Sequence, residues 1–338
     1  MPSPTPPPLG DLLDALSVVS IPLRTRFRGV THREAALLRG PAGWGEFAPF
    51  LEYPPAEASR WLAAAVEAAW VGWPDPVRDE VPVNATVPAV AAGDVAGVLA
   101  RFDGCTTAKV KVAETGQTLA DDVARVSEVR RVMGPAARVR VDANGGWSVA
   151  EAVTALTALG RCDLEYAEQP CRTVEELAEL RVALARRHVD VPVAADESIR
   201  KATDPVRVAR LHAADLVVVK VAPLGGVRAA LAVVEACGLP AVVSSALDTS
   251  VGIRAGVALA ASLPRLDHAC GLGTVALLEG DVAQDSCVPR RGAIGIREVT
   301  ADPELLDRWA APPDRVDRWR TRLADCHAEL VASARMGA

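Results

Sequence analysis

The feature that most restricts how this chain can fold is a series of charged residues, each placed just after a short run of apolar or β-branched residues. The series consists of Lys109, Lys111, Asp142, Glu168, Asp196 and Lys220. From Lys111 onward, successive members lie between 24 and 31 residues apart. One strand, one helix and two loops together have roughly this length. The spacing therefore predicts a repeated βα unit whose strands end at charged side chains.

The hydrophobic pattern after Pro82 supports this repeat, because short β-branched runs alternate with stretches rich in Ala, Glu and Arg. Strands are expected at 83–87, 107–112, 138–143, 164–167, 191–195, 216–219, 241–244 and 268–271. Helices are expected at 119–132, 149–159, 174–187, 205–211, 227–237 and 251–263. Strands that alternate with helices in this way favour a parallel (β/α) barrel over an open doubly wound sheet.

The two ends of the chain lack this alternation. Strand patterns at 15–24, 34–38 and 44–49 come before a helical pattern at 55–70, which indicates a small α+β domain. A charged helical pattern covers 303–333. We therefore predict an α/β protein with a TIM-like barrel at residues 83–290. Residues 1–82 are expected to form an α+β capping domain, with residues 291–338 packed back on it.

Composition excludes several classes of function. The net charge of −6 argues against a nucleic-acid-binding or anionic-membrane-binding surface. The seven cysteines are odd in number and never form a C-x-x-C pair, so they indicate buried thiols in a reducing compartment and no zinc site. The proline-rich start shows no secretory signal pattern, and no run of 18 apolar residues occurs. These features predict a cytoplasmic protein.

Alternation within two strands decides which way their charged residues point. Lys109 and Lys111 share one face of a strand, with Val110 on the other. The helix-facing side of a barrel strand must be apolar, so the lysines should point into the lumen, where they need carboxylate partners. The alternative is an exposed edge strand that lysines protect from aggregation. The next strand favours the lumen, because Asp142 lies on its polar face.

Carboxylates at the ends of three strands predict a metal site. Asp142, Glu168 and Asp196 should converge at the carboxyl ends of the barrel strands and would repel one another without a cation. Oxygen ligands alone favour Mg²⁺, with Mn²⁺ as a substitute. The alternative for each acid taken singly is a solvated loop charge. A metal beside a lysine base can support removal of the proton next to a substrate carboxylate, which creates an enediolate.

The lysines suit different parts of such a reaction. Lys111 is the candidate base, Lys109 would favour its neutral form by charge repulsion, and Lys220 ends a later strand at the same mouth.

The order and spacing of these motifs resemble the enolase superfamily, in the branch that contains muconate cycloisomerases, dipeptide epimerases and o-succinylbenzoate synthases. The motifs are K-x-K at 109–111, D-x-N at 142–144, Glu168-Gln169-Pro170, Ala195-Asp196-Glu197-Ser198 and Lys220. The resemblance covers nearly the whole chain and implies an enolase-type, modified (β/α)7β barrel with a capping domain. It also implies that Asp142, Glu168 and Asp196 bind Mg²⁺.

Within that branch, residues 27–34, 45–50 and 271–274 are similar to the actinobacterial o-succinylbenzoate synthase family of menaquinone biosynthesis. This likeness implies a hydro-lyase that makes 2-succinylbenzoate by syn-dehydration of 2-succinyl-6-hydroxy-2,4-cyclohexadiene-1-carboxylate. Lys111 would remove the α-proton and then assist departure of the β-hydroxyl. Lys220 would stabilise the enediolate or hold the ring by a cation–π contact.

The resemblance further implies that cap loops at 23–31 and 47–53 close over the barrel mouth and supply specificity. The partner is then a small-molecule carboxylate, and a monomer is expected. The candidate substrate contacts are Arg28, Arg140, Asn144, Ser244, Ser245, Gly271 and Gly273.

Other functions remain open on the sequence. A racemase of N-acylamino acids or a dipeptide epimerase has the same lysine requirement, and a muconate-type cycloisomerase ranks lower. The glycine pair Gly225-Gly226 before a helix permits a phosphate-binding barrel. A non-catalytic structural protein is the third class, against which the intact lysines and carboxylates argue.

Overall fold

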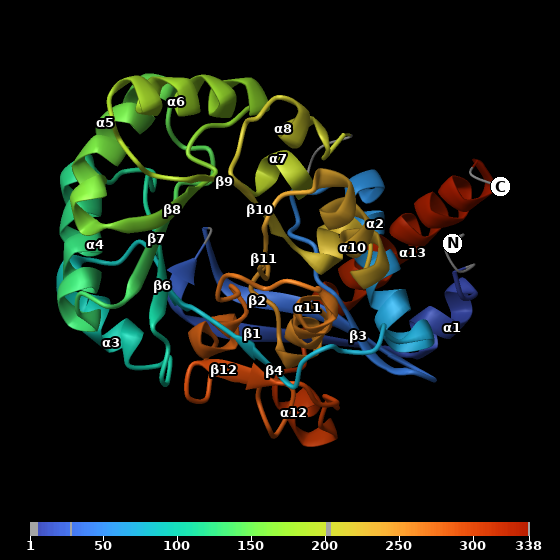
Figure 1. Cartoon of the computed structure of the whole chain (residues 1–338). Helices are drawn as coiled ribbons and strands as arrows, with labels where there is room; N and C mark the ends of the chain where they lie inside the picture. Colours follow the sequence, from blue (N-terminus) through green and yellow to red (C-terminus); the bar gives the residue numbers. More distant parts are fainter. Residues whose placement is uncertain (1–5, 28, 201–203, 337–338) are drawn as a thin grey trace.

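A curled parallel sheet forms the wall of the barrel in this computed structural model, which describes residues 6–27, 29–200 and 204–336 (Figure 1). Its strands pair in sequence order, each parallel to the next. They are β5 (Ala85–Val87), β6 (Thr107–Lys111), β7 (Arg138–Asp142), β8 (Leu164–Glu168), β9 (Val193–Ala195), β10 (Leu216–Val219) and β11 (Ala241–Val243). The predicted fold class is confirmed.

The eighth predicted strand, 268–271, is reduced to two isolated parallel bridges. Val83 pairs with Cys270, and Ser244 pairs with Gly271. The chain then turns into the 3₁₀ segment η4 (Gly273–Leu277), so this strand ends almost where it begins. These bridges join β11 to the segment before β5 and close the wall.

Helices cover the outside of the curled sheet, as Figure 1 shows for the units after β6, β7 and β8. The long ones are α4 (Leu119–Met133), α5 (Val149–Leu159), α6 (Val174–Arg186), α10 (Val227–Cys237) and α11 (Ser250–Ser262). The short ones are α3 (Val95–Leu99), α7 (Glu197–Arg200), α8 (Arg207–Arg210) and α9 (Val221–Leu224). Capping boxes built on Thr118, Ser148 and Thr173 begin α4, α5 and α6, which explains the close agreement with the predicted starts.

The N-terminal part is an antiparallel sheet backed by helices. It comprises α1 (Leu9–Asp14), β1 (Leu16–Phe27), β2 (Val30–Gly40), β3 (Gly43–Phe47) and α2 (Pro55–Val66), which continues as the π-helical turn η1 (Glu67–Val71). A Cβ atom on Gly45 would lie 2.1 Å from the carbonyl oxygen of Ala65. Glycine at this position therefore lets α2 pack directly on the sheet.

The C-terminal segment forms α12 (Pro303–Arg308) and α13 (Pro313–Met336), where the sequence predicted one helix. Pro312 and Pro313 cannot continue a helix from the preceding turn, so α13 starts anew there. Its Trp319 ring packs edge-on against Phe47 of β3, with 5.6 Å between centroids. The remaining strands, β4 (Glu80–Pro82) and β12 (Ala293–Gly295), pair with each other near the two predicted domain boundaries. Among the described helices, none has the length and apolar character required to cross a membrane.

Candidate active site

The register of the parallel sheet places charged residues of neighbouring strands side by side at their carboxyl ends. Lys111 pairs with Asp142, and Asp142 pairs with Glu168. Glu168 pairs with Ala194, and Asp196 follows two residues later on the same face. Lys220 directly follows β10. The strand ends thus form a row of three carboxylates with a lysine at each end.

Each carboxylate of this row bonds to a lysine. The Lys109 ammonium lies 2.9 Å from both oxygens of Glu168 and 3.4 Å from Asp142. Lys111 donates to Asp142, and Lys220 donates to Asp196. The three carboxylates are at most 1% exposed, so their charges are balanced by lysines and not by solvent.

Burial and charge act differently on the three carboxylates. Burial by itself would raise the pKa of Asp142, but Lys111 and Lys109 hold that pKa well below its usual range. For Asp196 burial is likewise outweighed, by Lys220 and Arg200, and the pKa falls to about 2. Burial and repulsion from Asp142 instead raise the pKa of Glu168 to about 7. Glu168 is therefore the carboxylate that would gain most from one more nearby cation.

The donor set fits a hard divalent metal ion. Asp142, Glu168 and Asp196 are three buried carboxylates, and their oxygen atoms match the ligands that Mg²⁺ prefers. Burial and repulsion from Asp142 and Asp196 raise the pKa of Glu168, and a bound cation would oppose that repulsion. Among the described residues, no three acidic, histidine or cysteine side chains are already gathered as a metal-binding group. The carboxylates turn toward the ammonium groups of Lys109, Lys111 and Lys220, which supply the positive charge at this row.

The buried lysines differ in electrostatics. Burial opposes the charge on Lys109, but Glu168 and Asp142 outweigh it and raise the pKa of Lys109. Burial lowers the pKa of Lys220, although Asp196 acts in the opposite direction. Lys109 is thus a permanent cation between two carboxylates. The predicted influence of Lys109 on the protonation of Lys111 stays a prediction.

Gln169 explains physically why the E-Q-P and A-D-E-S motifs occur together. Its amide oxygen accepts from the backbone N–H groups of Asp196 and Ser198, and its amide nitrogen donates to Cys171 and to the Ser198 hydroxyl. The residue adopts φ +39°, a left-handed conformation that turns the chain after β8. Gln169 therefore positions Asp196 relative to Glu168.

Two further contacts connect this row to the N-terminal part, through side chains that the sequence analysis did not name as site residues. Arg200 donates to Asp196, Glu197 and the Tyr53 hydroxyl. The only sequence signal was its position four residues after Asp196. Phe27, at the end of β1, places its ring 5.5 Å from the Lys111 ammonium. The cap loops predicted to lie over the barrel mouth do contact the site here.

Among the predicted substrate contacts, Asn144 lies in the site and Arg140 lies below it. Asn144 accepts from Lys111 and donates to Glu197. Arg140 is one register step deeper, fully buried, and donates to Glu165, Asn84 and the carbonyl of Ala269.

The Arg140 guanidinium also covers the ring of Tyr166 at 4.7 Å, in the lumen. Arg140 is therefore part of the barrel floor. It shares the inward face of β7 with Asp142 but lies two residues earlier in the strand, so it does not reach the carboxylate row.

The remaining predicted contacts form the wall between β11 and the last bridge. The Ser245 hydroxyl is 2.8 Å from both the Gly271 carbonyl and the Thr274 hydroxyl. A Cβ atom on Gly271 would lie 2.5 Å from the Ser244 hydroxyl, so glycine permits this close approach. A Cβ atom on Gly273 would make a less tight contact, 3.1 Å from the backbone carbonyl oxygen of Asn84. Arg28 lies outside the described residues.

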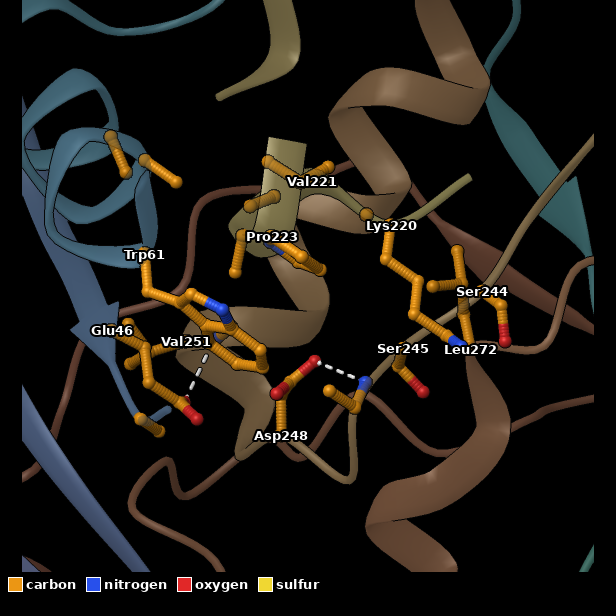
Figure 2. A pocket seen from close by; sticks show the side chains of 18 residues that line it. Glu46, Trp61, Lys220, Val221, Pro223, Ser244, Ser245, Asp248, Val251 and Leu272 are labelled. Atoms are coloured by element: carbon orange, nitrogen blue, oxygen red, sulfur yellow. Dashed lines mark hydrogen bonds between the residues drawn. The ribbon is translucent and has the colours of Figure 1, made fainter. Parts of the chain in front are cut away.

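A small cavity of about 30 Å³ lies where the N-terminal sheet and α2 meet this wall (Figure 2). Lys220 and Ser245 line it from the barrel, and Glu46 and Trp61 from the N-terminal part. Asp248, which accepts from the backbone N–H of Ala246, also lines it. The N-terminal part therefore contacts the barrel directly beside a site lysine.

Glu46 should make stability depend on pH. Burial and repulsion from Asp248 outweigh Arg33 and raise the pKa of Glu46 to about 8. Because this folded-state pKa exceeds the ordinary value of 4.5, the stability it contributes is full below about pH 4.5 and lost above about pH 8. Urea unfolding across this range should show a steeper decline for the wild type than for Glu46→Gln. Parallel profiles would contradict the assignment.

The phosphate-binding alternative loses its structural basis. Gly225 and Gly226 do precede a helix N-terminus, that of α10, but the buried carboxylate of Glu67 accepts from its first backbone N–H groups. A protein side chain thus takes the position that a phosphate would need.

Comparison with known proteins places this arrangement in a family. Residues 94–300 match the family described as enolase C-terminal domain-like, and residues 18–69 match the enolase N-terminal domain-like family. Among solved structures, a muconate lactonizing enzyme from Pseudomonas fluorescens in complex with muconolactone superposes with a TM-score of 0.73 at 22% identity. That comparison covers 88% of this chain and 98% of the other. The L-Ala-D/L-Glu epimerase of Bacillus subtilis gives 0.70 at 25% identity, covering 85% and 96%.

Several curated proteins are much more similar to this chain in sequence than these solved structures are. An o-succinylbenzoate synthase of Mycobacterium bovis is 57% identical over 331 residues, which are 98% of this chain and 99% of that protein. An o-succinylbenzoate synthase of Thermobifida fusca is 58% identical over 309 residues, 91% of this chain and 95% of that protein. The chain therefore belongs to the enolase superfamily and to the family of these o-succinylbenzoate synthases.

Proposed function

We propose that this chain is a hydro-lyase that converts 2-succinyl-6-hydroxy-2,4-cyclohexadiene-1-carboxylate into 2-succinylbenzoate by syn-dehydration, a step of menaquinone biosynthesis. The observation that carries the proposal is identity of 56 to 58% with named o-succinylbenzoate synthases over more than nine-tenths of the chain. The site is consistent with it, because a row of buried carboxylates lies between Lys111 and Lys220.

Asp142, Glu168 and Asp196 would hold Mg²⁺, with Mn²⁺ as a substitute, and enzymes of this superfamily generally use Mg²⁺. Bound there, the ion would supply the positive charge that makes an enediolate accessible. The support in this chain is the raised pKa of Glu168. Among the three carboxylates, Glu168 is the one at which nearby cations do not outweigh the effects of burial and of repulsion from Asp142. Binding of a cation would relieve that repulsion.

Lys111 is assigned the proton transfers. As a neutral amine it would take the proton from the ring carbon that bears the carboxylate. As the ammonium it would return that proton to the departing hydroxyl, so that water leaves and the ring becomes aromatic. Asn144, which bonds to Lys111, would orient it. Lys109 remains charged between Glu168 and Asp142 and would stabilise negative charge at the row.

Lys220 would face the substrate from the opposite end of the row and stabilise the enediolate or contact the ring. Ser244, Ser245, Gly271 and Gly273 form the wall next to Lys220 and are proposed to receive the succinyl side chain, together with Arg28. The segment at Phe27 and the loop at Tyr53 would exclude water from the site. Arg140 would act from below the site, by holding the floor of the lumen.

All seven cysteines are free, and six of them are buried. This fits our inference of a reducing, cytoplasmic location. A monomer that acts on a small carboxylate completes the proposal.

Racemisation or epimerisation of an acylated amino acid is the second candidate, because lysines at both ends of the row could each exchange a proton with one face of a substrate. Incubation with the cyclohexadiene substrate and, separately, with N-succinyl amino acids in deuterium oxide tests the choice. Aromatic product should form rapidly, detected by its ultraviolet absorbance, while deuterium incorporation with inversion should be slow or absent. Inversion at a rate comparable to dehydration would demote the dehydratase assignment.

A further inference from the structure

Two glutamates of the N-terminal part reach across to the barrel and bind the first turns of two neighbouring helices. Glu46 of β3 is the first. Its carboxylate accepts from the Thr249 backbone at 3.1 Å, the Thr249 hydroxyl at 2.6 Å and the Gly252 backbone at 3.0 Å. These donors lie at the N-terminus of the 13-residue helix α11. Glu46 is only 8% exposed, so solvent does not compete for them.

Glu67, the first residue of the π-helical turn, makes the same kind of contact with α10. It accepts from the backbone of Val227, from the backbone of Arg228 at 3.2 Å, and from the Arg228 guanidinium at 2.9 Å. A Cβ atom on Gly226 would lie 2.3 Å from the Glu67 carboxylate. Gly226, with φ +132°, therefore leaves the space that this carboxylate fills.

Both contacts have a common physical basis. The first N–H groups of a helix have no partner within the helix, and a carboxyl oxygen that accepts from them satisfies these otherwise unpaired donors. A carboxylate from another part of the chain that satisfies these groups is held in position by several hydrogen bonds. Two such contacts on adjacent helices define both the position and the orientation of the N-terminal sheet over the barrel.

These helices belong to the part of the barrel that carries half of the site. Lys220 directly precedes α9, which α10 follows, and residues 244–249 directly precede α11. On the other side, Glu46 pairs with Leu37 of β2, within the sheet whose β1–β2 hairpin ends near Phe27 and Lys111. One continuous sheet thus links the anchored glutamate to the ring above the proposed base.

We propose that Glu46 and Glu67 are positioning residues that set where the N-terminal sheet lies over the barrel mouth, and thereby the binding of substrate. This inference rests on the proposed function, because the substrate is the one proposed above. Lys111, Lys220 and the carboxylate row lie on barrel strands. The two glutamates thus act on the cap contacts and leave the proton-transfer groups in place.

Steady-state kinetics of Glu67→Ala test the proposal. Loss of the carboxylate should raise KM by about tenfold, the effect of losing a helix N-terminal cap, while kcat stays within about threefold. Acetate added to Glu67→Ala should lower KM again, because it can bind at the vacated helix N-terminus. Sodium chloride at equal ionic strength should not. Glu57→Ala, in the first turn of α2, is the matched control and should respond to neither salt.

Glu46 offers rescue by a conservative variant. Glu46→Gln keeps a carbonyl oxygen for Thr249 and Gly252 and should retain a KM near that of the wild type, whereas Glu46→Ala should raise it. A purely structural role would lower the amount of active enzyme, and so kcat, with KM unchanged. An unchanged KM in Glu67→Ala and Glu46→Ala therefore overturns the proposal, as does a raised KM in Glu67→Ala that acetate fails to lower.

Hydrogen exchange separates this test from the proposed reaction. The amides of Val227 and Arg228 should exchange faster in Glu67→Ala than in the wild type, whatever the substrate. If the wild type does not dehydrate the cyclohexadiene substrate, the proposed function fails while the exchange result still stands. Unchanged exchange at both amides would overturn the anchoring role of Glu67.

Discussion

Replacement of Lys111 with alanine is expected to reduce dehydration by about 10³- to 10⁴-fold, the upper range for loss of a general acid–base group. The residue lies at the carboxyl end of β6, bonded to Asp142 and Asn144 and covered by Phe27. Both proton transfers are assigned to this one amine, so its loss should slow both removal of the α-proton and departure of the hydroxyl. The measurement is kcat in the presence of Mg²⁺.

Lys111→Arg is the control that separates proton transfer from charge. Arginine keeps a cation next to Asp142 but cannot lose its proton at neutral pH, so this variant should be almost as inactive as alanine while unfolding at a temperature near that of the wild type. Activity of Lys111→Ala within tenfold of the wild type would remove Lys111 from the proposed mechanism. Recovery of activity in Lys111→Arg would show that its charge alone is needed.

Glu168→Gln is expected to abolish the stabilisation of the protein by Mg²⁺ and to reduce kcat by about 10³-fold or more, because charge stabilisation at such sites is usually the largest catalytic contribution. Wild-type protein at a Mg²⁺ concentration about 100-fold above Kd should gain about 2.7 kcal/mol in unfolding free energy. The variant removes one of three ligand carboxylates and should show little of that gain. Thermal unfolding with and without Mg²⁺ measures this independently of activity.

A second effect of Glu168→Gln follows from its pKa of about 7. Without metal, the neutral amide avoids the repulsion that Asp142 and burial impose on the carboxylate, so the variant should lose little stability or gain some. Glu179→Gln, exposed on α6, is the matched control and should keep the full response to Mg²⁺. An equal Mg²⁺ response in Glu168→Gln and the wild type would contradict the assignment of this ligand.

The strand ends show why much of the site was predictable. In a parallel sheet the carboxyl ends lie at one edge, so the spacing of Lys111, Asp142 and Glu168 in sequence translates directly into adjacency. Alternation then assigns Lys109 to the lumen, and its bonds to Glu168 confirm that orientation. Arg140 shows the limit of the same rule, because alternation gives the face of a residue but not how deep in the lumen it lies.

Contacts between distant segments were not predictable in this way. Glu46 and Glu67 lie about 200 and 160 residues before the helices that they anchor, and no local pattern marks either one. The pairing of Arg200 with Tyr53 is of the same kind. Glu165, whose strand position sends it away from the carboxylate row, is explained only by its neighbours Arg140 and His268, which bring its pKa down to about 2 against the effect of burial.

The sequence by itself determined the barrel, the family and the row of strand-end charges, because these depend on period, spacing and the common direction of parallel strands. Only the tertiary structure decided how the N-terminal sheet is anchored on α10 and α11 and which lysine bonds to which carboxylate. Such contacts depend on where whole elements pack against each other, and the free energy that selects them comes from burial and hydrogen bonding between residues far apart in the chain.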